Sequence, residues 1–118
     1  MSFKVAVASS DGKYVNQHFG MAQQFLIFEI DDEGNYKFLE IRENTPACDV
    51  GGHTDEAMAR SAELISDCEA VLASQIGHGA VNALASYGVE AYMAPTFIET
   101  ALKELAALKK ETDNNIHS

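Results

Sequence analysis

The chain is poor in cysteine, proline and basic residues, and it contains no tryptophan. Among its 118 residues are two cysteines and two prolines, and eight Lys and Arg stand against eighteen Asp and Glu, for a formal net charge of −10. Two cysteines are too few for a disulfide scaffold of the kind found in exported proteins. Because nucleic acids and anionic membranes attract clusters of Lys and Arg, we expect neither as a partner.

Long apolar runs are also missing, since none approaches the ~18 residues that span a bilayer. Residues 1–7 lead straight into polar positions without the apolar stretch of a signal peptide, so we expect a cytoplasmic protein. Hydrophobic residues make up 47%, which is typical of a folded chain. We predict one domain over residues 1–110 and a flexible C-terminal tail over 111–118, which is polar and has no periodicity.

The first part of the chain has the pattern of three strands. Phe3–Ala8 alternates and is rich in strand-forming residues, and Phe25–Ile30 and Tyr36–Ile41 read in the same way. A hairpin turn is expected at 31–35, where Gly34 and Asn35 can adopt positive φ. Residues 13–23 show no clear period and are predicted to form a loop.

Helices and strands alternate in the rest of the chain. A helix is expected from an N-cap at Thr54 to about Ser66, followed by a buried strand over 70–73. A second helix follows residues 77–79 and ends at Gly88, and a fifth strand at 89–93 precedes a last helix with a stripe of apolar residues. The order βββ-α-β-α-β-α predicts an α/β fold with one mixed five-stranded sheet and flanking helices, similar to ribonuclease-H-like folds.

Four possible metal ligands fall in the expected connections: His18, Cys48, His53 and His78. Loops at the carboxyl ends of parallel strands commonly form a ligand crevice, so these side chains could converge there. Imidazole and thiolate suit iron–sulfur species. Each histidine could equally be an ordinary surface residue, whereas Cys68, beside apolar residues, is expected to be a small core side chain.

Glycines accompany these ligands at two expected helix starts. Gly51 and Gly52 precede the first helix, and Gly77 and Gly79 flank His78. Backbone N–H groups at helix N-termini attract anions, including an anionic metal–sulfur cluster. The run from Gly77 lacks the third glycine of a dinucleotide-binding loop and the lysine of a P-loop. The candidate binding residues are therefore His18, Cys48, Gly52, His53, Gly77, His78 and Gly79, of which His18, Cys48, His53 and His78 could bind metal.

Catalytic patterns are weak, and we predict that the chain is not an enzyme. The first strand contains no Asp or Glu, whereas a two-metal nuclease needs converging carboxylates. No Gly-x-Ser-x-Gly nucleophile motif occurs. Cys48 could act as a nucleophile with a histidine, but no third, activating group is visible.

Several short segments, in this order and spacing, resemble the nitrogenase iron-molybdenum cofactor biosynthesis family, the group of NifX, NafY and the C-terminal domain of NifB. The resemblance covers roughly residues 3–109, and its segments are Val5–Ser9, His18–Gly20 with Phe25 and Phe28, Asn44, Gly51–His53, Ile76–Ala80 and Gly88–Val89. It implies a ribonuclease-H-like fold without nuclease activity. It also implies a nitrogenase accessory role, in which iron–sulfur precursors are held and passed between assembly proteins.

The expected function is thus a non-catalytic carrier or scaffold that binds an iron–sulfur or iron–molybdenum cofactor precursor in a labile way. Cofactor-assembly proteins are the expected partners. Many relatives have further cysteines in the loop before the first helix, where this chain has only Cys48. Two alternatives therefore stay open: a protein-contact or regulatory domain without a cluster, and a phosphoester hydrolase that uses Gly77, His78 and Gly79. The sequence does not predict the oligomeric state.

Overall fold

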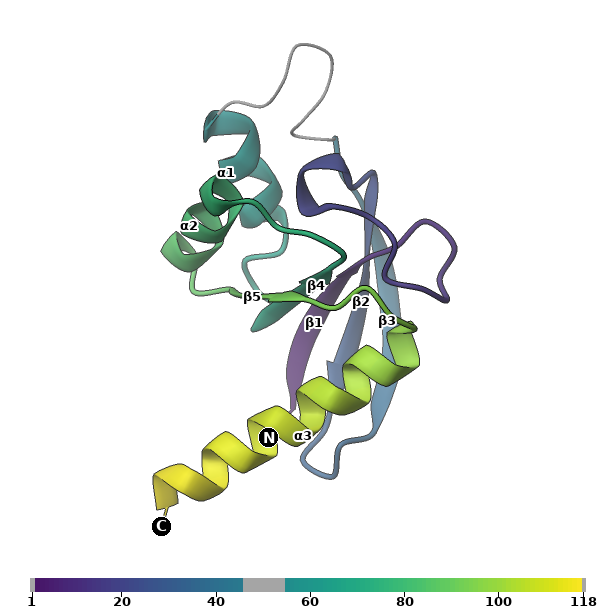
Figure 1. Cartoon of the computed structure of the whole chain (residues 1–118), viewed down its shortest axis with the longest axis vertical. Helices are drawn as coiled ribbons and strands as arrows, with labels where there is room; N and C mark the ends of the chain where they lie inside the picture. The colour runs from purple at the N-terminus through teal and green to yellow at the C-terminus, as the bar shows by residue number, and fades with distance from the viewer. Residues whose placement is uncertain (1, 46–54, 118) are drawn as a thin grey trace.

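The computed structural model describes residues 2–45 and 55–117, which form a sheet with helices packed on it (Figure 1). Its elements are β1 (Phe3–Ala8), the 3-10 turn η1 (Phe19–Met21), β2 (Gln24–Ile30), β3 (Tyr36–Glu43), α1 (Asp55–Leu64), β4 (Ala70–Ala73), α2 (His78–Ser86), β5 (Glu90–Met93) and α3 (Ile98–His117). The predicted order of three strands followed by alternating helices and strands is confirmed.

The five strands form one sheet in the order β3-β2-β1-β4-β5. β1 pairs antiparallel with β2, and β2 with β3. β1 pairs parallel with β4, and β4 with β5. The predicted mixed five-stranded sheet is thereby confirmed, with β3 and β5 at its two edges.

Each face of the sheet carries its own apolar core, because successive strand residues point to opposite faces. Ala6, Phe25 and Val71 belong to the core under α1 and α2, whereas Val7 and Leu72 belong to the core under α3. In Figure 1, α1 and α2 lie together beside the upper part of the sheet, and α3 crosses the lower part. The fold thus has three layers, with α1 and α2 on one face of the sheet and α3 on the other.

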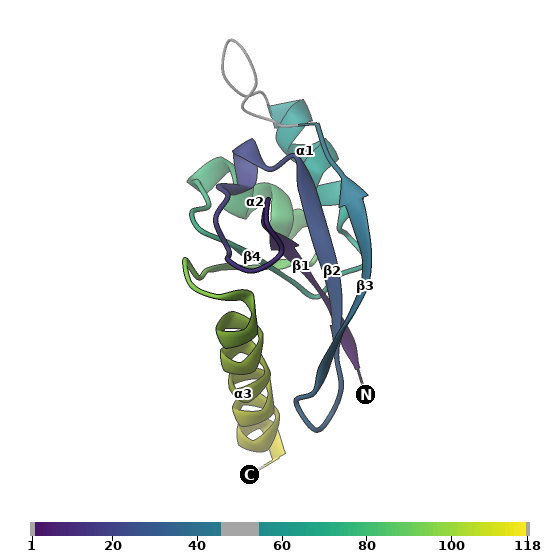
Figure 2. The same ribbon diagram turned by 90° about the vertical axis from the view of Figure 1, so that its right-hand side faces the viewer.

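Four local expectations need correction. Residues 13–23 contain η1, and His78 is the first residue of α2 rather than part of a loop. Positive φ occurs at Gly34, at 89°, but at no non-glycine residue of the described part, so Asn35 does not adopt it. α3 runs through His117 and extends past the sheet, so the residues before 118 in the tail predicted over 111–118 continue this helix (Figure 2). Adding residues to an existing helix is cheap compared with starting one, which explains this extension.

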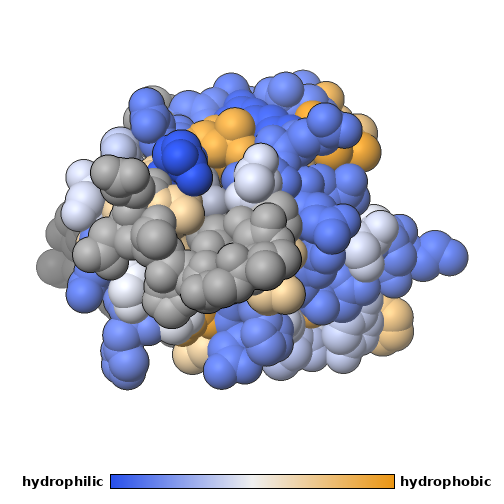
Figure 3. All heavy atoms as spheres, turned by 90° about the horizontal axis from the view of Figure 1, so that it is seen from above, coloured by the Kyte–Doolittle hydropathy of each residue, from blue (hydrophilic) through white to orange (hydrophobic). Residues whose placement is uncertain are grey.

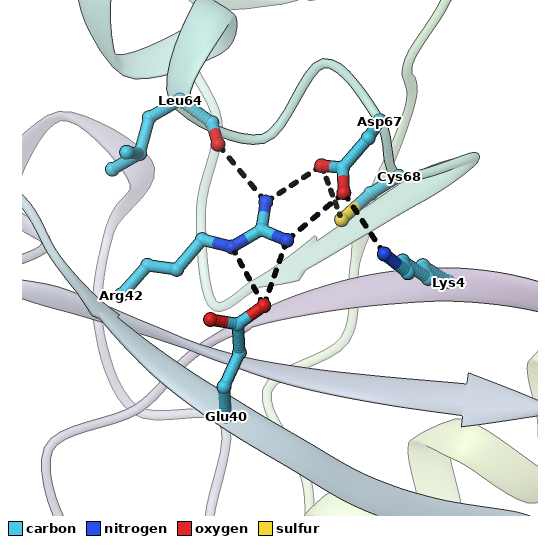
Figure 4. A network of polar contacts seen from close by, with 6 residues as sticks. All are labelled: Lys4, Glu40, Arg42, Leu64, Asp67 and Cys68. Atoms are coloured by element: carbon cyan, nitrogen blue, oxygen red, sulfur yellow. Dashed lines mark hydrogen bonds and ion pairs between the residues drawn. The ribbon is translucent and has the colours of Figure 1, made fainter.

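A polar network fastens the edge strand β3 to the junction between α1 and β4 (Figure 4). The Arg42 guanidinium donates hydrogen bonds to both carboxylate oxygens of Asp67, at 2.6 and 2.9 Å. It also donates to the Leu64 carbonyl at 3.1 Å and to Glu40 at 3.0 Å, and Lys4 lies 3.2 Å from the same Asp67 carboxylate. The Arg42 bonds lower the pKa of Asp67 far below its usual value. Because Arg42 is only 17% exposed, this bidentate pair is better shielded from solvent than a typical surface pair.

We predict that Asp67→Asn lowers the free energy of unfolding by about 1–2 kcal/mol at pH 7, discounted for the partial exposure of Asp67. The depressed folded-state pKa stabilises the fold above the unfolded-state value of about 3.9. The wild-type advantage should therefore shrink as pH falls below about 4 and vanish once the folded carboxyl is protonated. Urea unfolding of both proteins between pH 7 and pH 2 measures this difference.

The matched control for this experiment is Lys103→Gln, which breaks the solvent-exposed ion pair between Glu99 and Lys103 on α3. It should leave unfolding unchanged within error, because exposed pairs contribute little. Equal effects of the two substitutions would contradict a specific role for the Arg42–Asp67 pair.

Two glycines of the α2 region should respond to alanine in opposite ways. Gly88 ends α2 with a φ of 75°, as predicted for its helix cap, so Gly88→Ala should destabilise the protein by about 1 kcal/mol. Gly79 lies in the first turn of α2, where an added Cβ meets nothing within 4 Å. Gly79→Ala should stabilise it by about 0.5–1 kcal/mol, because alanine favours helix. Thermal unfolding of both variants provides the test.

Candidate functional site

The connections that carry the predicted ligands lie at one end of the strands, and we call this end the carboxyl edge of the sheet. β1, β4 and β5 are parallel, so their carboxyl ends meet at the same edge of the sheet. β3 runs antiparallel to β2 and so ends at this edge as well. Figure 3 shows the molecule from above, and its coloured residues form a mostly hydrophilic surface with a few hydrophobic side chains. The carboxyl edge is the position at which mixed and parallel sheets commonly bind ligands.

The connection after β1 is joined directly to the connection after β4. His18 and Gln75 form a parallel β-bridge, and the Phe19 N–H donates to the Gln75 carbonyl at 2.9 Å. The Ser74 N–H donates to the Gln17 carbonyl at 3.0 Å. His78 begins α2 three residues after Gln75, so both described histidine candidates lie on adjoining segments. The side chains of His18 and His78 are exposed.

The side chain of Phe19 anchors the segment that carries His18 in the core. Its side chain is fully buried and packs against Phe25 of β2, with ring centroids 5.7 Å apart. His18 precedes η1, and its carbonyl accepts the Met21 N–H at 3.0 Å. An apolar anchor followed by a tight turn therefore keeps the histidine at the surface of the edge.

Among the described residues, no side-chain capping bond is made at the start of α2. Its N-cap is Gly77, and no acidic residue lies in the first turn. A Cβ at Gly77 or Gly79 would meet nothing within 4 Å, so packing does not require either glycine. The first-turn N–H groups thus face an exposed surface with the partial positive charge of a helix N-terminus.

The connections after β1 and β5 are also tied together. The Val15 N–H donates to the Thr96 carbonyl at 2.8 Å, and the Tyr14 hydroxyl donates to the Pro95 carbonyl at 2.9 Å. The Asp11 carboxylate accepts the N–H groups of Lys13 and Tyr14, which lowers the pKa of that carboxyl. Asp11 is therefore engaged in organising its own turn.

The end of β3 is held against the same edge by Asn44, one of the positions in the resemblance. Its Nδ2 donates to the Ala22 carbonyl at 2.9 Å, and its Oδ1 accepts the buried Ser61 hydroxyl of α1 at 3.2 Å. The sequence pattern did not reveal the contribution of Ser61 or of Gln17. The Gln17 Oε1 is buried without a hydrogen-bond partner among the described residues.

The seven predicted binding residues are only partly covered by the structure. Four of them, His18, Gly77, His78 and Gly79, lie at the carboxyl edge. The other three, Cys48, Gly52 and His53, lie outside the described residues. Within residues 2–45 and 55–117, no group of three or more His, Cys, Asp or Glu is arranged to hold a metal ion. The two described histidines alone therefore do not form a closed metal centre.

Cys68 is a core side chain, as predicted. It is 3% exposed, and burial together with the neighbouring Asp67 carboxylate raises the pKa of its thiol to about 12. It precedes β4 and therefore lies at the opposite end of the sheet from His18. A thiol that stays protonated is a poor metal ligand.

Comparison with known proteins finds relatives that carry the names NifB and NifX. The chain is 37% identical over 106 residues to the FeMo cofactor biosynthesis protein NifB of Frankia alni. The matched region covers 87% of this chain but 21% of that protein. It is 36% identical over 87 residues to Protein NifX of Azotobacter vinelandii, covering 74% of this chain and 53% of NifX. The chain thus spans a fifth of the first relative and about half of the second.

The fold comparison agrees. An NMR structure from Thermotoga that carries the NifB name superimposes with a TM-score of 0.58 at 26% identity, covering 89% of this chain and 88% of that one. No helix in the described part of the chain is both long and apolar enough to cross a membrane. Residues 1–108 match the family described as dinitrogenase iron-molybdenum cofactor. This chain therefore belongs to the dinitrogenase iron-molybdenum cofactor family, whose members include NifX and a domain of NifB.

Proposed function

We propose that this chain is a non-catalytic carrier or scaffold that binds an iron–sulfur or iron–molybdenum cofactor precursor at the carboxyl edge of its sheet. The observation that carries the proposal is the bridge between His18 and Gln75, which joins the His18 segment to the start of α2 at His78. Membership of a family named for this cofactor supports the class of cargo. Cofactor-assembly proteins in the cytoplasm are the corresponding donors and acceptors.

The chemistry of the edge suits a weakly held cluster. Two exposed imidazoles can bind iron, and the first-turn N–H groups at the start of α2 favour an anionic cargo. Cys48 and His53 remain predicted ligands that would complete the set. The net charge of −10 repels an anionic cluster at a distance, but salt screens this repulsion beyond ~10 Å at 0.1 M. Short-range ligation at the edge therefore decides binding.

The ribonuclease-H-like classification is part of this proposal. The order β3-β2-β1-β4-β5, with two antiparallel and two parallel pairings, supports it. A nuclease of that class needs carboxylates on its first strand, and β1 has none.

The proposal is tested by anaerobic titration with Fe²⁺ and sulfide, followed by absorbance and EPR. We expect about one cluster signal per chain and an affinity that falls about tenfold or more in His18→Ala, His78→Ala and Cys48→Ala, because each removes a ligand. His117→Ala is the matched control, since His117 ends α3, away from the carboxyl edge. It should bind as the wild type does.

Two outcomes would overturn the carrier proposal. Absence of a signal in the wild type would favour a protein-contact domain of the same fold. Equal binding by the wild type and by His18→Ala and His78→Ala would place any cluster elsewhere in the chain.

A separate prediction concerns the thiols. At pH 8 only Cys48 should react readily with a thiol reagent in the folded protein, because Cys68 is buried and its pKa is about 12. Cys48→Ala should therefore show almost no fast reaction, whereas unfolding in guanidinium should release one thiol in that variant. Fast labelling of folded Cys48→Ala would show that Cys68 is available as a ligand.

A further inference from the structure

The outer strand β3 exposes an apolar row. Phe38 and Ile41 are each 52% exposed and Leu39 is 37% exposed. Phe38 packs edge-on against Phe28 of β2, with ring centroids 5.6 Å apart, and Ile41 lies opposite Leu26. Both neighbours belong to the core under α3, so the row continues that core to the open edge of the sheet. Figure 2 shows β3 at the outside of the sheet, opposite α3.

A bulge lies in the middle of this strand. Ile27 of β2 is opposite Glu40 and Phe28 is opposite Phe38, so Leu39 is an extra residue. Bulges often protect edge strands, because they interrupt the regular row of donors and acceptors. Whether this one prevents pairing depends on which backbone groups point outward on either side of it.

The hydrogen bonds at the two ends of β3 give that orientation. The Asn44 N–H donates to the Gln23 carbonyl at 2.9 Å, and the Asp31 N–H donates to the Asn35 carbonyl at 2.9 Å. Alternation from these ends turns residues 35, 37, 40, 42 and 44 toward β2. Four residues then turn their N–H and C=O groups outward: Tyr36, Phe38, Ile41 and Glu43.

These outward positions are symmetric about the point between Leu39 and Glu40. Two β3 strands related by a two-fold axis through that point would pair Phe38 with Ile41 of the second copy, and Tyr36 with Glu43 of the second copy. The bulge of each strand would then lie at the axis. We propose that β3 is a self-association surface, on which a second copy of this chain pairs antiparallel in this register to form a continuous ten-stranded sheet.

Charge favours a second copy at this edge. The charged side chains of β3 are Lys37 and Arg42 against Glu40 and Glu43, so the strand is neutral in a chain of net charge −10. Lys37 lies 3.6 Å from Glu29, and Arg42 is engaged by Asp67 within its own chain. Two acidic copies can therefore approach here without the repulsion expected over most of their surface.

The antiparallel arrangement would leave the candidate site free in both copies. Their carboxyl edges would point in opposite directions, so each His18 and His78 pair would stay exposed. An interface built around one strand is at the small end of the range for specific complexes, so association should depend strongly on concentration.

The test measures the mass of the protein by light scattering from about 1 µM to 1 mM, within the range expected of weak interfaces. The wild type should shift from monomer to dimer, whereas Phe38→Glu and Ile41→Lys should each remain monomeric. Mixing these two variants should restore a dimer, because Glu at 38 then faces Lys at 41 of the other chain. A mixture of Phe38→Glu with Ile41→Glu is the matched control and should stay monomeric.

Circular dichroism confirms that each variant is folded, which is expected because both positions are half exposed. Phe97→Lys, at a residue that is 60% exposed outside β3, should leave the wild-type dimer intact. The proposal is wrong if the wild type stays monomeric at 1 mM or if Phe38→Glu still dimerises. It is wrong in its register if the oppositely charged mixture does not restore the dimer.

Discussion

The parallel pairing of β1 with β4 is the constraint on which the rest of the structure depends. β1 is the central strand, and Val5, Ala6, Val7 and Ala8 are fully buried between the two helical layers. It is antiparallel to β2 on one side and parallel to β4 on the other. The connections that leave β1 and β4 therefore emerge together, and this brings the His18 segment against the residues that start α2.

That pairing also explains why the candidate site, which lies on a connection and at a helix start, has a defined geometry. The backbone bonds between residues 17–19 and 74–75 continue the β1–β4 ladder beyond the strands themselves. The fully buried side chain of Phe19 then fixes the position of the His18 segment. The exposed imidazole of His18 is thus attached to a rigid backbone scaffold.

The fold was predictable from local patterns to a large extent, because strand alternation and helix stripes report burial directly. β1 and β4 have the predicted bounds, and β2 and β3 extend the predicted ones by one or two residues. The bulge at Leu39, the His18–Gln75 bridge and the Arg42–Asp67 pair were not predictable. Each depends on residues that meet only after the sheet has formed, and single positions carry no signal for such contacts. For the candidate site, residue types indicated His18 and His78, whereas the supporting Ser61 and Gln17 gave no signal.

The polar network around Arg42 and Asp67 stabilises the fold without using any of the candidate ligands. Arg42, near the end of β3, and Asp67, just before β4, join β3 to the end of α1 and the start of β4. The carboxylate of this ion pair also helps to keep the neighbouring Cys68 as a neutral thiol. At the carboxyl edge, exposed histidines and the first-turn N–H groups of α2 contribute little to folding. Residues that contribute little to stability are free to change without loss of the fold, so the candidate ligands at this edge could vary while the sheet and its two cores stay the same.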